Sequence, residues 1–228
     1  MIRESFLKVG IDLNCEQEGK FASYMERLIE SNKKFNLTAI TDPEEIAVKH
    51  FVDSVMGERF IPKSAKVADV GSGAGFPAIP IAIMRPDLKF TLIDSLLKRV
   101  NFLTETTKLL DVNAECLHLR AEDAGRGELR EQFDCVVARA VAPLSALCEY
   151  TLPLVKVGGI FLAYKGAESG EEVKGAQNAL NVLGGKVKIK EEFTLPDGSG
   201  RSVVVIEKAF PTPKKYPRGQ NKPRLAPL

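Results

Sequence analysis

The sequence predicts a Rossmann-like α/β fold: a seven-stranded, mainly parallel sheet with an antiparallel final strand, preceded by a helical N-terminal segment. Three observations support this prediction. Strand-like and helical segments alternate from residue 65 onward. The last two strand-like segments follow each other without a helix, and a glycine-rich loop follows the first strand.

The first sixty residues are predicted to be helical. Between residues 21 and 29, apolar side chains recur at the spacing of one helix face: Phe21, Tyr24, Met25, Leu28 and Ile29. A second helix is predicted to begin near residue 42. Asp42 is a good N-cap, Pro43 suits the first helical position, and Glu45 is placed to close a capping box.

The parallel part of the sheet is predicted from five apolar segments, at 65–70, 89–94, 114–120, 133–140 and 159–165. Helices are expected between and after them, at 76–85, 96–110, 143–155 and 168–183. Such alternation implies right-handed crossovers and a sheet covered on both faces. Segments 186–195 and 201–210 are joined only by a PDGSG turn, so they are expected to pair antiparallel.

Length and composition are those of a globular protein. The chain has 228 residues, 44% of them apolar and 27% charged, and we expect three parts: a helical extension (1–60), the α/β domain (61–210) and a tail (211–228). No apolar run is long enough for a membrane span, and the first residues lack a signal-peptide core. The four cysteines form no CxxC pair, so we expect no metal site and a cytoplasmic protein.

Charge is balanced overall but not along the chain. The net charge is +2, whereas the residues from Lys208 to Leu228 include six Lys or Arg and no Asp or Glu. We expect this Pro-rich tail to be extended rather than packed, and to contact an anionic partner.

The strongest functional signal is the glycine-rich loop after the first strand. Gly71, Gly73 and Gly75 alternate with small residues, including Ser72, which allows positive φ angles and close approach of a ligand to backbone. A tight strand–helix turn is the alternative explanation. The third glycine arrives one residue earlier than in the dinucleotide pattern GxGxxG, and Phe76 takes its place.

An acidic residue beside this loop indicates the ligand class. Asp69 would repel a pyrophosphate, but it suits a ligand that carries its own cation. S-adenosylmethionine carries both an ammonium and a sulfonium group. The spacing and the carboxylate together therefore favour S-adenosylmethionine over a dinucleotide.

Two further acidic positions follow the next two strands. Asp94 ends the second strand, where a carboxylate accepts hydrogen bonds from ribose hydroxyls, although a helix N-cap is also possible. Ala121 and Glu122 follow the third strand and are placed either to contact an adenine edge or to form a solvated acidic loop. All these positions lie at carboxyl ends of consecutive strands, where open α/β sheets bind ligands.

Five other side chains have both a functional and a structural interpretation. Arg139, near the end of the fourth strand, binds guanine or phosphate, or forms a salt bridge. Lys165 contacts a substrate or marks the end of the fifth strand. His118 and Cys135 are expected to be structural, and His50 is not required as a general base.

The chain resembles a known family at this point. The segments DVGSGAGFPAIPIAI, TLIDSLLKRVNFL, RAED, VVARAVAPLSAL and LAYKG look like successive blocks of the RsmG (GidB) family of bacterial small-subunit rRNA methyltransferases. NKKFNLTAI, KHFVDS and the C-terminal KYPR…PL match its flanking blocks, so the resemblance covers about residues 30–228. It implies a class I methyltransferase fold with an antiparallel final strand.

The resemblance also implies an activity: methyl transfer from S-adenosylmethionine to N7 of a guanine in the 530 loop of 16S rRNA, leaving S-adenosylhomocysteine. It places Asp69 and the loop Gly71, Ser72, Gly73, Gly75 and Phe76 at the methionine end of the cofactor. Asp94 would contact the ribose, Ala121 and Glu122 the adenosine, and Arg139 the mouth of the site. The basic residues expected to face RNA, including tail residues, are Lys98, Arg120, Arg139, Lys165, Lys214, Lys215 and Arg218.

The motifs that the chain lacks fit methylation at guanine N7. Guanine N7 exposes a lone pair, so its methylation needs alignment rather than proton removal, and Arg139 is the candidate that positions the substrate. The fourth strand is followed by ARAVAPL, not by an NPPY-type motif for an exocyclic amine.

We expect a monomer that acts on 16S rRNA or the small ribosomal subunit. The alternatives are a small-molecule methyltransferase and a non-catalytic ribosome assembly factor on the same fold.

Overall fold

The computed structural model describes residues 1–34 and 36–228, so Phe35 in the NKKFNLTAI block lies outside the described residues. Its seven strands form one sheet in the order β3-β2-β1-β4-β5-β7-β6. The strands are β1 (Lys66–Val70), β2 (Lys89–Asp94), β3 (Ala114–His118), β4 (Phe133–Arg139), β5 (Val155–Gly166), β6 (Gly185–Thr194) and β7 (Gly200–Lys208). The first five pair in parallel, and β7 lies antiparallel between β5 and β6. The predicted mixed sheet is therefore confirmed.

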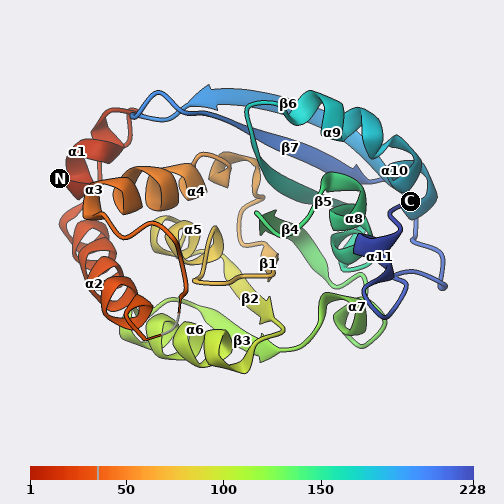
Figure 1. The fold of residues 1–228 in the computed structure, drawn as a ribbon, viewed down its shortest axis with the longest axis horizontal. Helices are drawn as coiled ribbons and strands as arrows, with labels where there is room; N and C mark the ends of the chain where they lie inside the picture. Colours follow the sequence, from red (N-terminus) through yellow and green to blue (C-terminus); the bar gives the residue numbers. More distant parts are fainter. Residues whose placement is uncertain (35) are drawn as a thin grey trace.

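Helices cover both faces of this sheet (Figure 1). The N-terminal segment contains α1 (Ile2–Leu7), α2 (Cys15–Asn32), α3 (Pro43–Ile46), the π-helical turn Ala47–Val52, α4 (Asp53–Val55) and the 3-10 turn Glu58–Phe60. The later helices are α5 (Ala78–Met84), α6 (Leu97–Leu109), α7 (Ala121–Ala124), α8 (Leu144–Thr151), α9 (Ser169–Gly175), α10 (Gln177–Leu183) and α11 (Lys222–Leu225).

Alternate residues of each strand enter different cores. Val67 of β1 and Val137 of β4 pack with the N-terminal helices, α5 and α6. Ala68 and Val136 belong instead to the core formed with α8 and α10. Since side chains alternate along a strand, Asp69 and Arg139 are on the face that the N-terminal helices cover.

Three helix predictions differ from the structure in detail. The helix expected at 143–155 ends at Thr151, and β5 already begins at Val155. The helix expected at 168–183 is interrupted at Ala176, directly after Gly175, whose lack of a side chain makes it a poor helix former. Asp42 caps α3 by accepting a hydrogen bond from the Glu45 backbone at 3.0 Å, as predicted. Glu45 does not close the capping box, because its carboxylate pairs with Lys49.

The expectation of an unpacked C-terminal tail is wrong. Thr212 and Tyr216 are buried, and the guanidinium of Arg130 donates hydrogen bonds to the carbonyls of both residues. Arg218 forms an ion pair at 2.7 Å with Glu149, a carboxylate that is 0% exposed. These contacts fix residues 210–228, called the strap below, against α8 and the loop after α7. The sequence could not reveal this, because the partners lie 69 or more residues away.

Across the described ranges 1–34 and 36–228, no helix is both long and apolar enough to span a membrane. The same ranges contain no cluster of three or more His, Cys, Asp or Glu placed to hold a metal ion.

Candidate active site

The glycine loop connects β1 to α5 at the carboxyl edge of the sheet, where the strand order reverses between β1 and β4. Gly71, Gly73 and Gly75 all have positive φ angles, of 72°, 60° and 98°. A Cβ on Gly71 would lie 2.7 Å from the Val141 side chain, so packing alone requires that glycine. A Cβ on Gly73 would meet nothing nearer than the Gly71 carbonyl at 3.8 Å, which leaves the outer surface of the loop open to a ligand.

Asp69 lies beneath this loop with an unusual environment. Its side chain is 0% exposed, and among the described residues neither carboxylate oxygen has a hydrogen-bond partner. Burial raises the pKa of this carboxyl to about 8. At neutral pH this buried carboxyl therefore holds its proton, and a cation brought next to it would favour the charged form.

Asp94, at the end of β2, connects the glycine loop to the next helix. Its carboxylate accepts hydrogen bonds from the backbone of Gly73 and Leu96, both at 2.9 Å, and lies 3.5 Å from Arg99. Leu96, not Asp94, is the N-cap of α6. Asp94 therefore ties the loop to the start of α6 and still has lone pairs for a ligand hydroxyl.

A first cavity of about 400 Å³ opens at this edge of the sheet, a volume typical of small-molecule sites. Its walls include Gly71, Asp94, Ala121 and Glu122, four of the residues for which the sequence predicts cofactor contacts. Glu122 is buried on α7, so the alternative of a solvated acidic loop is wrong for this side chain.

The other predicted cofactor residues lie beside or behind this cavity. Ser72 is buried and donates a hydrogen bond to the backbone carbonyl of Asp69. Phe76 packs in an aromatic cluster, with ring centroids 4.4 Å from His50 and 5.5 Å from Tyr24. Phe76 thus supports the N-terminal helices against the loop.

A second cavity, of about 860 Å³, adjoins the first. The two share one wall, formed by Ala140, Val141, Ala142 and Arg224. The remaining lining of the second cavity is mostly polar and charged. It comes from the N-terminal segment and from residues between β4 and β7: Lys49, His50, Asp53, Arg139, Tyr164, Lys165, Glu172 and Arg201.

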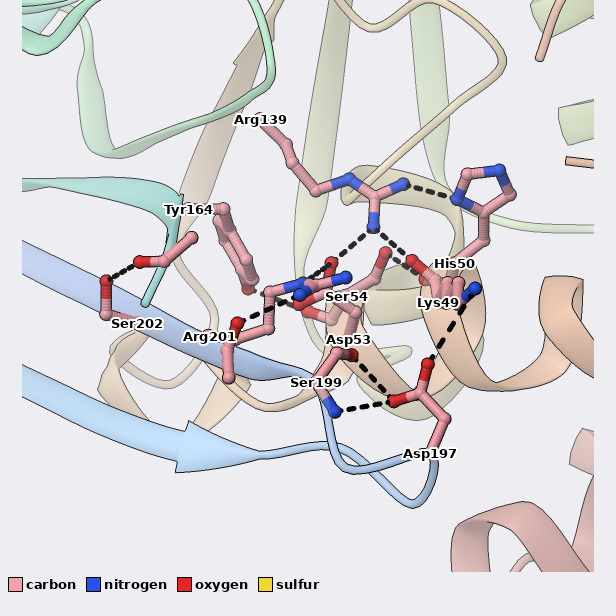
Figure 2. Close-up of polar contacts among 12 residues, drawn as sticks. Lys49, His50, Asp53, Ser54, Arg139, Tyr164, Asp197, Ser199, Arg201 and Ser202 are labelled. Atoms are coloured by element: carbon pink, nitrogen blue, oxygen red, sulfur yellow. Dashed lines mark hydrogen bonds and ion pairs between the residues drawn. The ribbon is translucent and has the colours of Figure 1, made fainter. Parts of the chain in front are cut away.

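Arg139 is held rigidly in this second cavity (Figure 2). Its guanidinium donates hydrogen bonds to Asp53 at 2.8 Å, to the Lys49 carbonyl at 3.1 Å and to His50 Nδ1 at 3.1 Å. The guanidinium carbon also lies 4.9 Å from the centroid of the Phe76 ring. The salt-bridge interpretation of Arg139 is therefore confirmed, and its role in positioning a substrate stays a prediction.

The tautomer of His50 follows from this contact. A guanidinium only donates, so Nδ1 accepts, and the Nε2 proton is directed at the Thr38 hydroxyl 2.8 Å away. Burial and the nearby Arg139 lower the pKa of His50 to about 3. The imidazole is consequently neutral at physiological pH, and both of its nitrogens are engaged.

Asp53 and Arg201 are two residues of this cluster that the sequence interpretation missed. Asp53 is buried and lies between Arg139, at 2.8 Å, and Arg201, at 3.7 Å. Burial raises the pKa of Asp53, and the two arginines oppose that shift. The signal in the sequence was the three-residue spacing of His50 and Asp53, which places both on one side of a helix.

The predicted RNA-facing residues divide into exposed and engaged groups. Lys98, Arg120, Lys214 and Lys215 are exposed. Lys165, by contrast, donates hydrogen bonds to Glu172 at 2.7 Å and to the Ala142 carbonyl at 3.0 Å. Arg218 is likewise engaged, through its ion pair with Glu149 in the strap, and its RNA contact stays a prediction. Of the two remaining candidates, Cys135 is a core residue as predicted, and the exposed His118 contacts the Ser95 carbonyl.

Comparison with known proteins shows which family the chain belongs to. The sequence model of GidB, described as rRNA small subunit methyltransferase G, matches residues 17–197. The chain belongs to this family. It is 48% identical to the ribosomal RNA small subunit methyltransferase G of Lactobacillus johnsonii over 97% of this chain and 95% of that protein. The namesake protein of Macrococcus caseolyticus is also 48% identical, over 96% and 94% of the two chains. The resemblance drawn from the sequence motifs is thereby confirmed.

Solved structures confirm the fold at lower identity. A SAM-dependent methyltransferase from Aquifex aeolicus superposes with a TM-score of 0.54 at 18% identity, covering 78% of this chain and 97% of that one. TYW2 from Pyrococcus horikoshii, solved with MeSAdo, gives a TM-score of 0.56 at 18% identity, over 69% and 61% of the chains. The predicted class I methyltransferase architecture of this GidB family member is therefore confirmed.

Proposed function

We propose that this protein transfers a methyl group from S-adenosylmethionine to N7 of a guanine in the 530 loop of 16S rRNA. Family membership supports a small-subunit rRNA methyltransferase. The observation that carries the proposal is the pair of adjoining cavities. One is lined by Gly71, Asp94 and Glu122, and in the other the basic residues outnumber the acidic residues Asp53 and Glu172. One suits the cofactor, and the other suits a nucleotide of an anionic RNA.

Residues of the first cavity and of the adjoining glycine loop fit the cofactor. Asp94 offers carboxylate oxygens to ribose hydroxyls, and the open surface at Gly73 admits a ligand against backbone. Asp69 is buried beneath the glycine loop, outside the lining of this cavity, and the cationic end of S-adenosylmethionine would favour its charged form. When bound, this cofactor supplies an electrophilic methyl group on a sulfonium.

The second cavity supports methylation of an atom that already carries a lone pair. His50 is neutral and engaged at both nitrogens, and Asp53 is paired with Arg139 and Arg201. Neither group is arranged to remove a proton from a substrate. The fixed guanidinium of Arg139 and the ammonium of Lys165 instead hold and orient the nucleotide, and orientation can supply about 7–11 kcal/mol of the barrier.

The test is transfer of labelled methyl from S-adenosylmethionine to unmethylated small subunits and to naked 16S rRNA, followed by nucleoside digestion. Label in 7-methylguanosine from the 530 loop is the expected result. Label on another atom or another loop would refute the N7 assignment. Labelled product without RNA would favour a small-molecule methyltransferase, and cofactor binding without any product would favour an assembly factor.

Exposed lysines of the strap are proposed to add RNA affinity. Lys214 and Lys215 are exposed and carry no ion pair among the described residues. Replacing both with alanine should weaken RNA binding and lower the slope of log affinity against log salt by about 1.4–1.8, because each lost phosphate contact contributes about 0.7–0.9. An unchanged slope would show that these lysines do not contact RNA.

We further propose that the enzyme is a cytoplasmic monomer.

A further inference from the structure

The C-terminal strap reaches the first cavity. Asn221 and Arg224, at the start and within α11, line it together with Tyr150 of α8. Arg224 also lines the second cavity, so this short helix lies where the two cavities meet. Figure 1 shows α11 beside α8, on the side of the sheet opposite the N-terminal helices.

The position of the strap is fixed by neighbouring residues of α8. Glu149, fully buried, accepts hydrogen bonds from the backbone and the guanidinium of Arg218 at 2.7–3.1 Å. The next residue, Tyr150, donates from its hydroxyl to Asn221 Oδ1 at 3.1 Å. Earlier in the chain, the ammonium of Lys208 at the end of β7 donates a hydrogen bond to the Thr212 hydroxyl at 2.7 Å. The strap is therefore held in a defined position by buried hydrogen bonds and an ion pair.

The conformation of Asn221 adds a second observation. Its φ angle is +58°, in the left-handed region that asparagine tolerates better than most residues. This backbone places the side chain at the cavity and starts α11. The contact with Tyr150 uses one lone pair of the amide oxygen, so one lone pair and two N–H donors remain for a ligand.

The other walls around Asn221 suit a nucleobase. Ile93 and Leu119 supply apolar surface, while Glu122 adds a buried carboxylate. Asp94, the proposed ribose contact, belongs to the same cavity. An asparagine amide matches adenine because its oxygen accepts from N6 and its nitrogen donates to N7.

We propose that the strap is part of the cofactor site and that the side-chain amide of Asn221 binds the adenine of S-adenosylmethionine. This inference rests on the proposed function, since it assigns the first cavity to that cofactor. It gives the strap a role distinct from RNA binding: residues 210–228 complete the adenosine pocket from outside the sheet.

The test is calorimetric titration of the full-length protein with S-adenosylhomocysteine, which requires no catalysis. Asn221→Gly removes the side chain and suits the positive φ, and Asn221→Asp keeps the shape but loses the donors. Each should weaken binding at least about tenfold. The matched control is Gln220→Gly, because Gln220 is exposed, has the same φ of 58° and lines neither cavity. The control should bind as the wild type does.

A second readout is trypsin cleavage in the strap after Lys214, Lys215 and Arg224, none of which is followed by proline. S-adenosylhomocysteine should slow cleavage of the wild type and should not slow cleavage of Asn221→Gly. Wild-type affinity in both Asn221 variants would overturn the inference, and so would an equal loss in Gln220→Gly. If these variants lost only RNA affinity, the strap would belong to the RNA site instead. Absence of binding by the wild-type protein would refute the proposed function itself.

Discussion

Replacing Gly73 with alanine tests where the cofactor lies. An alanine at a φ of 60° costs about 1–2 kcal/mol of unfolding free energy, and the added methyl approaches no protein atom closer than 3.8 Å. For a chain of this size, each kcal/mol lowers Tm by about 2–4 °C, so we expect a loss of about 2–8 °C. The protein should remain folded, because domains are typically stable by about 5–15 kcal/mol.

In Gly73→Ala, the main effect should be a loss of cofactor affinity, while the protein stays folded. With no protein atom in its way, the methyl occupies the space that a ligand on the loop needs, so calorimetry should show S-adenosylhomocysteine binding weakened at least about tenfold, or about 1.4 kcal/mol. A folded variant with wild-type affinity would refute the placement of the cofactor over this loop.

Gly71→Ala is the matched comparison for the same loop. Its Cβ would lie 2.7 Å from Val141 in addition to the positive φ of 72°, so overpacking adds about 1–3 kcal/mol to the conformational cost. Thermal unfolding should therefore show a larger loss for Gly71→Ala than for Gly73→Ala. The reverse order would contradict the steric argument.

Three further changes test the site and the strap. Burial raises the pKa of Asp69 to about 8, so between pH 4 and 8 the native state holds a proton that the unfolded chain has lost. The free energy of unfolding should fall as pH rises through this range, by at most about 1.4 kcal/mol per unit, and urea titrations of Asp69→Asn should show a flatter dependence. His50→Phe removes the acceptor for Arg139 and should lower kcat/KM for methyl transfer about tenfold, whereas His50→Asn should retain more activity because its amide oxygen can replace Nδ1. Arg218→Ala leaves Glu149 buried without its ion pair and should cost about 3–5 kcal/mol, measured as a Tm lower by about 6–20 °C.

The sheet could be predicted because each strand is specified by a short stretch of the sequence. Each strand is a short apolar run bounded by turn residues, and the PDGSG turn determines how the last two strands pair. The break at Ala176 was less visible, because the apolar spacing of Val173, Leu180 and Leu183 continues across it. Periodicity reports which face is buried, but not where one helix ends and the next begins.

The site was predictable only where the sheet itself supplies its residues. Gly71, Asp94 and Glu122 follow consecutive strands, so topology alone brings them together. The partners of Arg139 are about 90 residues away, and those of Arg218 are 69 away. Such pairs depend on how the terminal segments pack, which no local pattern specifies. The basic composition of the tail even suggested the opposite, since an ion-paired arginine and a free one look alike in sequence.

The two ends of the chain therefore act on the site from opposite faces of one sheet. The N-terminal helices hold Arg139 through His50 and Asp53, on the face where Asp69 is buried. The strap closes the other cavity through Asn221, and Arg224 borders both. Because the cavities share the wall 140–142, we expect a ligand bound against this wall in one cavity to affect binding in the other. Cofactor and RNA binding should accordingly be coupled, and by reciprocity RNA must alter cofactor affinity by the same factor that the cofactor alters RNA affinity.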